Sequence, residues 1–222
     1  MVSAMGRIER YGVSTVSVLA ERMRRVLGEN GLIALPTESF YGLAVDPFNE
    51  QALVKLWQVK GRSNGKPVLV LIGEGAQLNP FVRNIPPAAT VLMNAFWPGP
   101  LTIVFPAGLG LPDAVTAGTR SVGIRLSAWQ PLCELLQRVG PLTGTSANRE
   151  GMPPPTTAEE VRHYFGDALD LIVDAGPTPG GRPSTVIDVQ GPIRIIRDGA
   201  IDREDIVAQL AAHGLSLDPD SE

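Results

Sequence analysis

The sequence is poor in the residues that build disulfides, metal sites and membrane segments. Its one cysteine, Cys133, rules out an intramolecular disulfide, and its two histidines, His163 and His213, lack ligand-like spacing. No apolar run approaches the roughly 18 residues that a membrane span needs. Residues 1–13 also lack the apolar core of a signal peptide. We therefore expect a cytoplasmic protein with Cys133 in the core of a helix.

An excess of positive charge is also missing. The formal net charge is -4, which argues against a protein whose whole surface grips nucleic acid but leaves room for a local basic site. We expect no metal site built by the chain itself. A Mg²⁺ ion can still arrive on a phosphate ligand, because magnesium needs few protein ligands.

What the sequence contains is an alternation of apolar strands and amphipathic helices, with 24 glycines and 20 prolines mostly between them. Ser14, Asn49 and Thr157 are suited to cap helices. Helical periodicity is expected over residues 14–27, 49–57, 87–96, 130–139, 157–165 and 202–212. Strands are expected at residues 32–35, 67–73, 101–106, 121–126, 141–146, 171–174, 184–189 and 193–197.

The organisation of these elements predicts one domain. The last two strands, joined at Gln190-Gly191, indicate a hairpin, so the sheet should be mixed rather than all parallel. No repeat or low-complexity linker interrupts the chain. We therefore expect a single domain over residues 1–222, with a core at about 14–201 and a frayed acidic tail at 215–222. The fold class is α/β, of the α+β type, with a three-layer arrangement.

Polar groups follow the first buried strand in "PTESFYG". Pro36 is expected to end that strand and Tyr41-Gly42 to turn the chain. One interpretation is an ordinary capped turn. The other is a lip that offers the Thr37 hydroxyl and an aromatic wall to a small ligand.

Three cations gather in "KGRSNGKP", namely Lys60, Arg62 and Lys66. The stretch is not a P-loop, because Pro67 stands where a serine or threonine should hold magnesium. The cations either lie at a solvated helix C-terminus, where positive charge is favourable, or clamp a triphosphate.

The stretch "GTSANREG" supplies hydroxyls and an amide where another strand ends. Thr145, Ser146 and Asn148 either cap and turn the chain or contact the phosphates or ribose of a nucleotide. The question is what this stretch holds, since no helix or strand requires such residues there.

Two more strands carry arginine. Arg125 alternates with apolar residues in "SVGIRL", so it either faces solvent or sits in a pocket with a carboxylate or phosphate. Ser184 begins one strand and Arg197 ends the partner strand. Taken together, these stretches predict a cleft of cations, hydroxyls and one amide. Such a cleft suits the binding and positioning of anions rather than covalent catalysis.

These stretches also resemble a known family when taken in order and spacing. The segments are "LPTESFYGLAVDPFN", "VKGRSNGKPVLVLI", "FWPGPLTIVF", "SVGIRL", "GTSANREGMPPPT", "STVIDV" and "IIRDGAI". From about residue 14 to 201 the chain resembles the YrdC family in its short, single-domain form. The resemblance implies a YrdC-like fold, a twisted mixed sheet flanked by helices.

The resemblance also implies a nucleotidyltransferase activity, L-threonylcarbamoyladenylate synthesis. In that reaction threonine and bicarbonate form N-carboxy-threonine, whose carboxylate attacks the α-phosphate of ATP. The products are threonylcarbamoyl-AMP and pyrophosphate, and Mg²⁺ would enter with ATP. Partner proteins would then transfer the threonylcarbamoyl group to the tRNA adenosine beside the anticodon.

Site residues follow from matching positions. Those implied for threonine are Thr37, Arg125 and Ser184, with Thr145 as a second-rank candidate. Those implied for the nucleotide are Lys60, Arg62, Lys66, Ser146, Asn148 and Arg197, with Ser121 as a second-rank candidate. The three cations of the "KGRSNGKP" stretch are also the candidates for catalysis. Leu71 stands where some members carry a histidine, so the threonine pocket can differ in detail.

Two other functions stay open. One is a module that binds double-stranded RNA or tRNA, against which the acidic net charge stands, and whose affinity would fall steeply with salt. The other is carbamoyl-adenylate chemistry with another acceptor. The Gly/Pro-rich residues 176–183 also permit a lid over the site.

Overall fold

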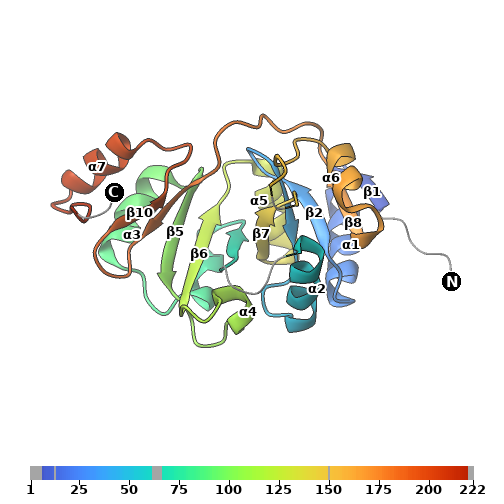
Figure 1. Ribbon diagram of the computed structural model, residues 1–222, viewed down its shortest axis with the longest axis horizontal. Helices are drawn as coiled ribbons and strands as arrows, with labels where there is room; N and C mark the ends of the chain where they lie inside the picture. The colour runs from blue at the N-terminus through green and yellow to red at the C-terminus, as the bar shows by residue number, and fades with distance from the viewer. Residues whose placement is uncertain (1–6, 13, 62–66, 150, 220–222) are drawn as a thin grey trace.

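The computed structural model describes residues 7–12, 14–61, 67–149 and 151–219, which form one ten-stranded sheet with helices on both faces (Figure 1). The strands are β1 (Arg7–Arg10), β2 (Ile33–Pro36), β3 (Tyr41–Ala44), β4 (Leu69–Ile72), β5 (Leu101–Pro106), β6 (Ser121–Leu126), β7 (Leu142–Ser146), β8 (Leu171–Asp174), β9 (Thr185–Asp188) and β10 (Arg194–Arg197). The α-helices are α1 (Val16–Gly28), α2 (Glu50–Lys60), α3 (Pro87–Phe96), α4 (Asp113–Thr116), α5 (Gln130–Val139), α6 (Ala158–Phe165) and α7 (Arg203–Ala211). Two short 3-10 helices, Gly75–Phe81 and Gly166–Ala168, complete the set.

The sheet is mixed, as predicted. Its strand order is β1-β8-β2-β3-β7-β4-β6-β5-β9-β10. Strands β9 and β10 form the expected antiparallel hairpin, whereas β5 and β9 are parallel. Strand β8 pairs with β1 and β2 at the other end of the sheet. The chain between β8 and β9 therefore crosses most of the sheet, and Figure 1 shows this connection passing over the top of the molecule.

Most helix boundaries follow from the sequence. Helices α3 and α5 occupy the predicted ranges. Asn49 caps α2 by accepting from Ala52 N, and Thr157 forms a capping box with Glu160 at α6. The predicted cap of α1 at Ser14 is wrong. Thr15 holds the N-cap position there, without a side-chain cap, because its hydroxyl donates to Gly12 O instead.

The predicted turn at Tyr41-Gly42 is also wrong. These residues begin β3, which pairs antiparallel with β2, so that Pro36 lies opposite Tyr41. The chain reverses earlier, at residues 37–40. Pro36 is the last residue of β2 and still pairs with Tyr41 of β3. Gly42 lets β3 lie close to β7, because a Cβ at this position would be only 3.3 Å from Thr145 O. Strand β1 was not anticipated.

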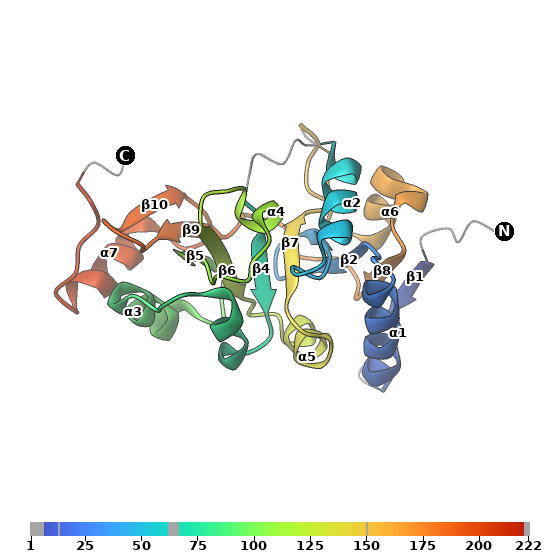
Figure 2. The same ribbon diagram turned by 90° about the horizontal axis from the view of Figure 1, so that it is seen from below.

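The two halves of the sheet are covered differently. In the half formed by β1, β8 and β2, Figure 2 shows α1 and α5 on one side and α2 and α6 on the other. Alternate residues of β2 accordingly pack into two core clusters, Ile33 with α1 and α5, and Ala34 with α2 and α6. In the other half, Ile103, Ile124 and Ile187 pack in the cluster that contains α3 and α7. The alternate residues of those strands lie on a face that, in the described ranges, no helix covers in this way.

Among the described residues, no helix is both long enough and apolar enough to cross a membrane.

Candidate active site

A cavity of about 560 Å³ occupies the open face of the sheet. Strand β6 contributes Ser121, Gly123 and Arg125 to it, while Val122 and Ile124 point into the core. The sequence pattern "SVGIRL" thus sends its small and charged residues to the cavity and its apolar residues to the helices. A separate hollow of about 590 Å³ lies between α3 and α7, and its described lining residues include no arginine or lysine.

Most of the predicted site residues meet in the cavity. Those that line it are Thr37, Ser121, Arg125, Thr145, Ser146, Ser184 and Arg197. Lys60 and Asn148 do not line it but contact the segment that does. Arg62 and Lys66 lie outside the described residues. The fold therefore brings together predicted site residues from five separate strands or loops.

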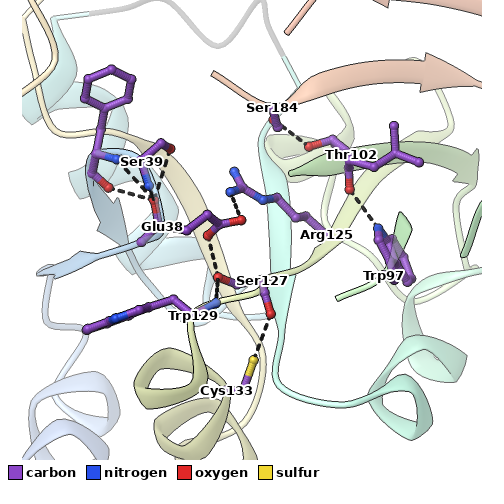
Figure 3. A network of polar contacts seen from close by, with 12 residues as sticks. Glu38, Ser39, Trp97, Thr102, Arg125, Ser127, Trp129, Cys133 and Ser184 are labelled. Carbon is purple, nitrogen blue, oxygen red and sulfur yellow. Dashed lines mark hydrogen bonds and ion pairs between the residues drawn. The ribbon is translucent and has the colours of Figure 1, made fainter. Parts of the chain in front are cut away.

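Arg125 is held by an acidic residue that the sequence analysis did not assign to the site. Its guanidinium is buried, with 5% of the residue exposed, and its Nη2 forms an ion pair with Glu38 Oε1 (Figure 3). Burial opposes ionisation of this carboxyl, but the Arg125 charge and the hydrogen bond from Ser127 outweigh that cost. The pKa of Glu38 therefore lies below its ordinary value.

Ser127 holds the other oxygen of the same carboxylate. Its hydroxyl donates to Glu38 Oε2 at 2.5 Å and accepts from Trp129 N at 3.2 Å, at the start of α5. Ser127 O accepts from Cys133 Sγ at 3.1 Å (Figure 3). Cys133 is buried, as predicted, and this burial raises the pKa of its thiol. The sequence did contain a signal for Ser127. It lies two residues after Arg125, so the alternation of side chains along the strand places both on the same side.

Arg197 is held by a main-chain carbonyl. Its Nε and Nη2 donate to Ser184 O at 3.2 and 2.9 Å, and its Nη2 also donates to Ser184 Oγ at 3.1 Å. The Ser184 hydroxyl is itself 2.9 Å from Thr102 Oγ1 (Figure 3). Burial and then the Arg125 charge lower the pKa of Arg197. Two arginines therefore act on the same cavity.

Lys60 is buried rather than solvated. It is the last residue of α2, and only 3% of it is exposed. Its Nζ donates to Ser146 O and to Asn148 O, both at 2.6 Å. Asn148 Nδ2 donates to Met152 O, while its Oδ1 is buried with no hydrogen-bond partner in the described part of the chain. Lys60 thus fixes the main chain of the "TSAN" segment from behind.

Thr37 forms the capped turn of the first interpretation and lies where the second requires it, while its contact with a ligand stays a prediction. Its hydroxyl donates to Phe40 O at 2.8 Å and accepts from the main-chain nitrogens of Ser39 and Phe40, which closes the turn between β2 and β3. The same residue also lines the cavity. Tyr41 lines it as well, and its hydroxyl donates to Gly176 O at 2.8 Å, which ties the long crossing connection to β3.

The arrangement favours the binding of small anions. Two arginines and several hydroxyls converge on one cavity, and Cys133, the one cysteine, is buried behind it. No group of three or more His, Cys, Asp or Glu side chains that could hold a metal occurs among the described residues. Together, the open-faced mixed sheet and this cavity are the features expected of a protein that binds and orients anionic small molecules.

Comparison with known proteins then gives the family. The model for the Sua5, YciO and YrdC proteins, described as telomere recombination, matches residues 25–199. The chain therefore belongs to the Sua5/YciO/YrdC family, and the predicted YrdC-like fold is confirmed.

Individual relatives agree with this result. The chain is 41% identical over 164 residues to a threonylcarbamoyl-AMP synthase of Thiobacillus denitrificans, covering 73% of this chain and 87% of that protein. It is 37% identical over 182 residues to the Pyrococcus abyssi threonylcarbamoyl-AMP synthase, covering 80% of this chain but only 53% of that protein. The chain thus spans about half the length of the second relative. The solved structure of P. abyssi Sua5 complexed with L-threonine superposes with a TM-score of 0.84, at 32% identity, covering 96% of this chain and 62% of that one.

Proposed function

We propose that the protein is a threonylcarbamoyl-AMP synthase. It condenses L-threonine, bicarbonate and ATP into threonylcarbamoyl-AMP and releases pyrophosphate and water. The observation that carries the proposal is the convergence of Arg125 and Arg197 with the Ser184 hydroxyl in one cavity. This convergence occurs in a chain whose relatives bear that name, and one solved relative is complexed with L-threonine.

The threonine end of the cavity is built around Arg125. The guanidinium is a fixed donor for the amino-acid carboxylate, with a planar geometry that a lysine does not offer. Thr37, Thr145 and Ser184 supply hydroxyls around it. Leu71 also lines the cavity and gives it an apolar wall.

The nucleotide end is built around Arg197. Its side chain is fixed by Ser184, and Ser146 and Ser121 line the same cavity. We assign Arg62 and Lys66 to the phosphates on the sequence motif alone. Lys60 contributes from behind, by shaping the "TSAN" main chain. Its direct contact with the nucleotide stays a prediction.

Charge neutralisation is the main task of such a site. The carboxylate of N-carboxy-threonine must approach the α-phosphate of ATP, and both carry negative charge. Arginines held in fixed positions offset this repulsion and align the reactants, so catalysis depends on positioning rather than on a covalent nucleophile. Mg²⁺ enters with ATP and is held mainly by its phosphates. Partner proteins then use the product to modify tRNA.

Pyrophosphate release tests the proposal. The full chain is incubated with ATP and Mg²⁺ while L-threonine and bicarbonate are each supplied or left out. We expect release only when both are present, and L-serine, which lacks the methyl group, serves as the comparison substrate. ATP binding without pyrophosphate release would indicate carbamoyl-adenylate chemistry with an acceptor other than L-threonine. Absence of both ATP binding and release, together with salt-sensitive tRNA binding, would favour the RNA-binding alternative.

A further inference from the structure

The guanidinium of Arg125 is only partly engaged by its protein partner. The ion pair joins Arg125 Nη2 to Glu38 Oε1, yet neither atom has an aligned hydrogen bond, and Arg125 Nε is buried without a hydrogen-bond partner among the described residues. A carboxylate that binds an arginine side-on uses two parallel N–H groups. Glu38 does not make that fork, so part of the guanidinium is left for another acceptor.

Glu38 is itself held in place from behind. Its Oε2 accepts from the hydroxyl of Ser127, a residue with 0% exposure, and that hydroxyl accepts from Trp129 N. The carboxylate is thereby tied to the start of α5 as well as to Arg125. A side chain with contacts on both oxygens is suited to orient its partner rather than to leave when a ligand arrives.

The same carboxylate balances the charge of the cavity. Arg125 and Arg197 are close enough to act on each other, since the Arg125 charge contributes to the lowered pKa of Arg197. Asp188 is the carboxylate among the described residues that line the cavity, and it accepts from Gln190 N and Nε2 without an ion pair to a described arginine. Glu38 is therefore the group that compensates one of the two arginines.

We propose that Glu38, held by Ser127, is a positioning residue for Arg125, which it keeps in the orientation that receives the carboxylate of L-threonine. The inference rests on the proposed function, because it assigns the ligand of Arg125 from it. It adds two residues that lie behind the ligand and do not need to touch it. Their effect should fall on amino-acid binding and leave nucleotide binding unchanged.

The test is calorimetric titration of the full chain with L-threonine, and separately with ATP. In Glu38→Gln we expect L-threonine binding to weaken by about tenfold, the scale of one charge-assisted contact, with ATP binding changed by less than about twofold. Ser127→Ala should weaken L-threonine in the same direction, by a smaller factor. Glu134→Gln is the matched control, because Glu134 pairs with Arg138 in a surface ion pair away from the cavity.

Kinetics and a double variant separate positioning from loss of folding. In Glu38→Gln the KM for L-threonine should rise while kcat at saturating L-threonine stays within about twofold. In an Arg125→Lys background, the additional substitution Glu38→Gln should not weaken L-threonine binding further, because the two residues act through one contact. If Glu38→Gln fails to fold, Ser127→Ala carries the same comparison.

The outcomes distinguish this inference from the function on which it rests. A wild-type protein that neither binds L-threonine nor releases pyrophosphate would overturn both. An active wild-type protein whose Glu38→Gln variant binds L-threonine equally well would overturn the positioning role alone. Tighter L-threonine binding in that variant would also overturn it, because Glu38 would then be a competitor of the substrate.

Discussion

Arg125 and Arg197 line the same cavity, but they are held in place by different kinds of partner. Arg125 lies on a central strand, β6, and pairs with the carboxylate of Glu38, which reaches it from the turn after β2. Arg197 ends the edge strand β10 and donates to the main-chain carbonyl of Ser184. The first arginine has a carboxylate counter-ion, whereas the second has no ion pair with a carboxylate in the described part of the chain. The cavity thus contains two kinds of arginine. The charge of Arg125 is offset by a carboxylate, whereas Arg197 is fixed by a neutral carbonyl and offers its positive charge to a ligand.

The largest expected effect comes from removing the compensated arginine. Arg125→Ala leaves the partly buried Glu38 carboxylate, whose Oε1 is fully buried, without its counter-charge, so we expect the free energy of unfolding to fall by about 3–5 kcal/mol. Urea denaturation measures it. The double variant Arg125→Met with Glu38→Gln should recover most of the stability but none of the activity. An unchanged stability in Arg125→Ala would show that the pair contributes nothing to the fold.

The next effect concerns the support of the uncompensated arginine. A Cβ at Gly199 would lie 2.3 Å from Ser184 C and from Thr185 N, so the main chain that holds Arg197 would have to move. We expect Gly199→Ala to cost about 1–3 kcal/mol, the range of an overpacked site. It should also lower turnover. Gly191→Ala is the control, since a Cβ there meets nothing within 4 Å. Equal stability of the two variants would contradict this account.

Removing Arg197 itself should disturb the fold less. Arg197→Ala leaves behind a neutral carbonyl and a hydroxyl that keeps its contact with Thr102, so we expect a loss of about 1 kcal/mol. Its turnover should nevertheless fall by about 10²-fold, because a preorganised charge at the nucleotide is lost. Denaturation and pyrophosphate release measure the two quantities. A stability loss as large as that of Arg125→Ala would remove the distinction between the arginines.

The smallest effect is a dependence of stability on pH. The pKa of Glu38 lies below its ordinary value of about 4.5, so its ionised form stabilises the folded state. This contribution is present above pH 4.5 and is lost as the pH falls through the lowered value. The stability of Glu38→Gln should therefore change less than that of the wild type between pH 5 and the acid limit of folding. Parallel curves would show that Glu38 ionises alike in both states.

The sequence predicted much of this site because its signals were local. The alternation in "SVGIRL" placed Arg125 on the face opposite Val122 and Ile124, and the "TSAN" segment was recognised as the polar end of a strand. The partner of Arg125 was missed because Glu38 lies in the turn between β2 and β3, whereas Arg125 is on β6, and β7 and β4 lie between β3 and β6 in the sheet. No local pattern encodes that pairing.

Burial was the other quantity that local pattern did not provide. Lys60 ends a helix, where a solvated cation is the ordinary case, and it is buried only because the end of β7 lies against it. Tyr41 and Gly42 resemble a turn, yet pairing with β2 and β7 makes them a strand. Tertiary contacts decided between the two alternatives for Lys60 and overturned the predicted turn at Tyr41-Gly42.

The most direct measurement is detection of the product by mass spectrometry. The protein is incubated with ATP, Mg²⁺, L-threonine and ¹³C-bicarbonate, and the nucleotide fraction is analysed at once. We predict threonylcarbamoyl-AMP with one ¹³C atom, formed by the wild type and strongly reduced in Arg125→Ala and Arg197→Ala. Release of pyrophosphate with no labelled adenylate of threonine would contradict the account.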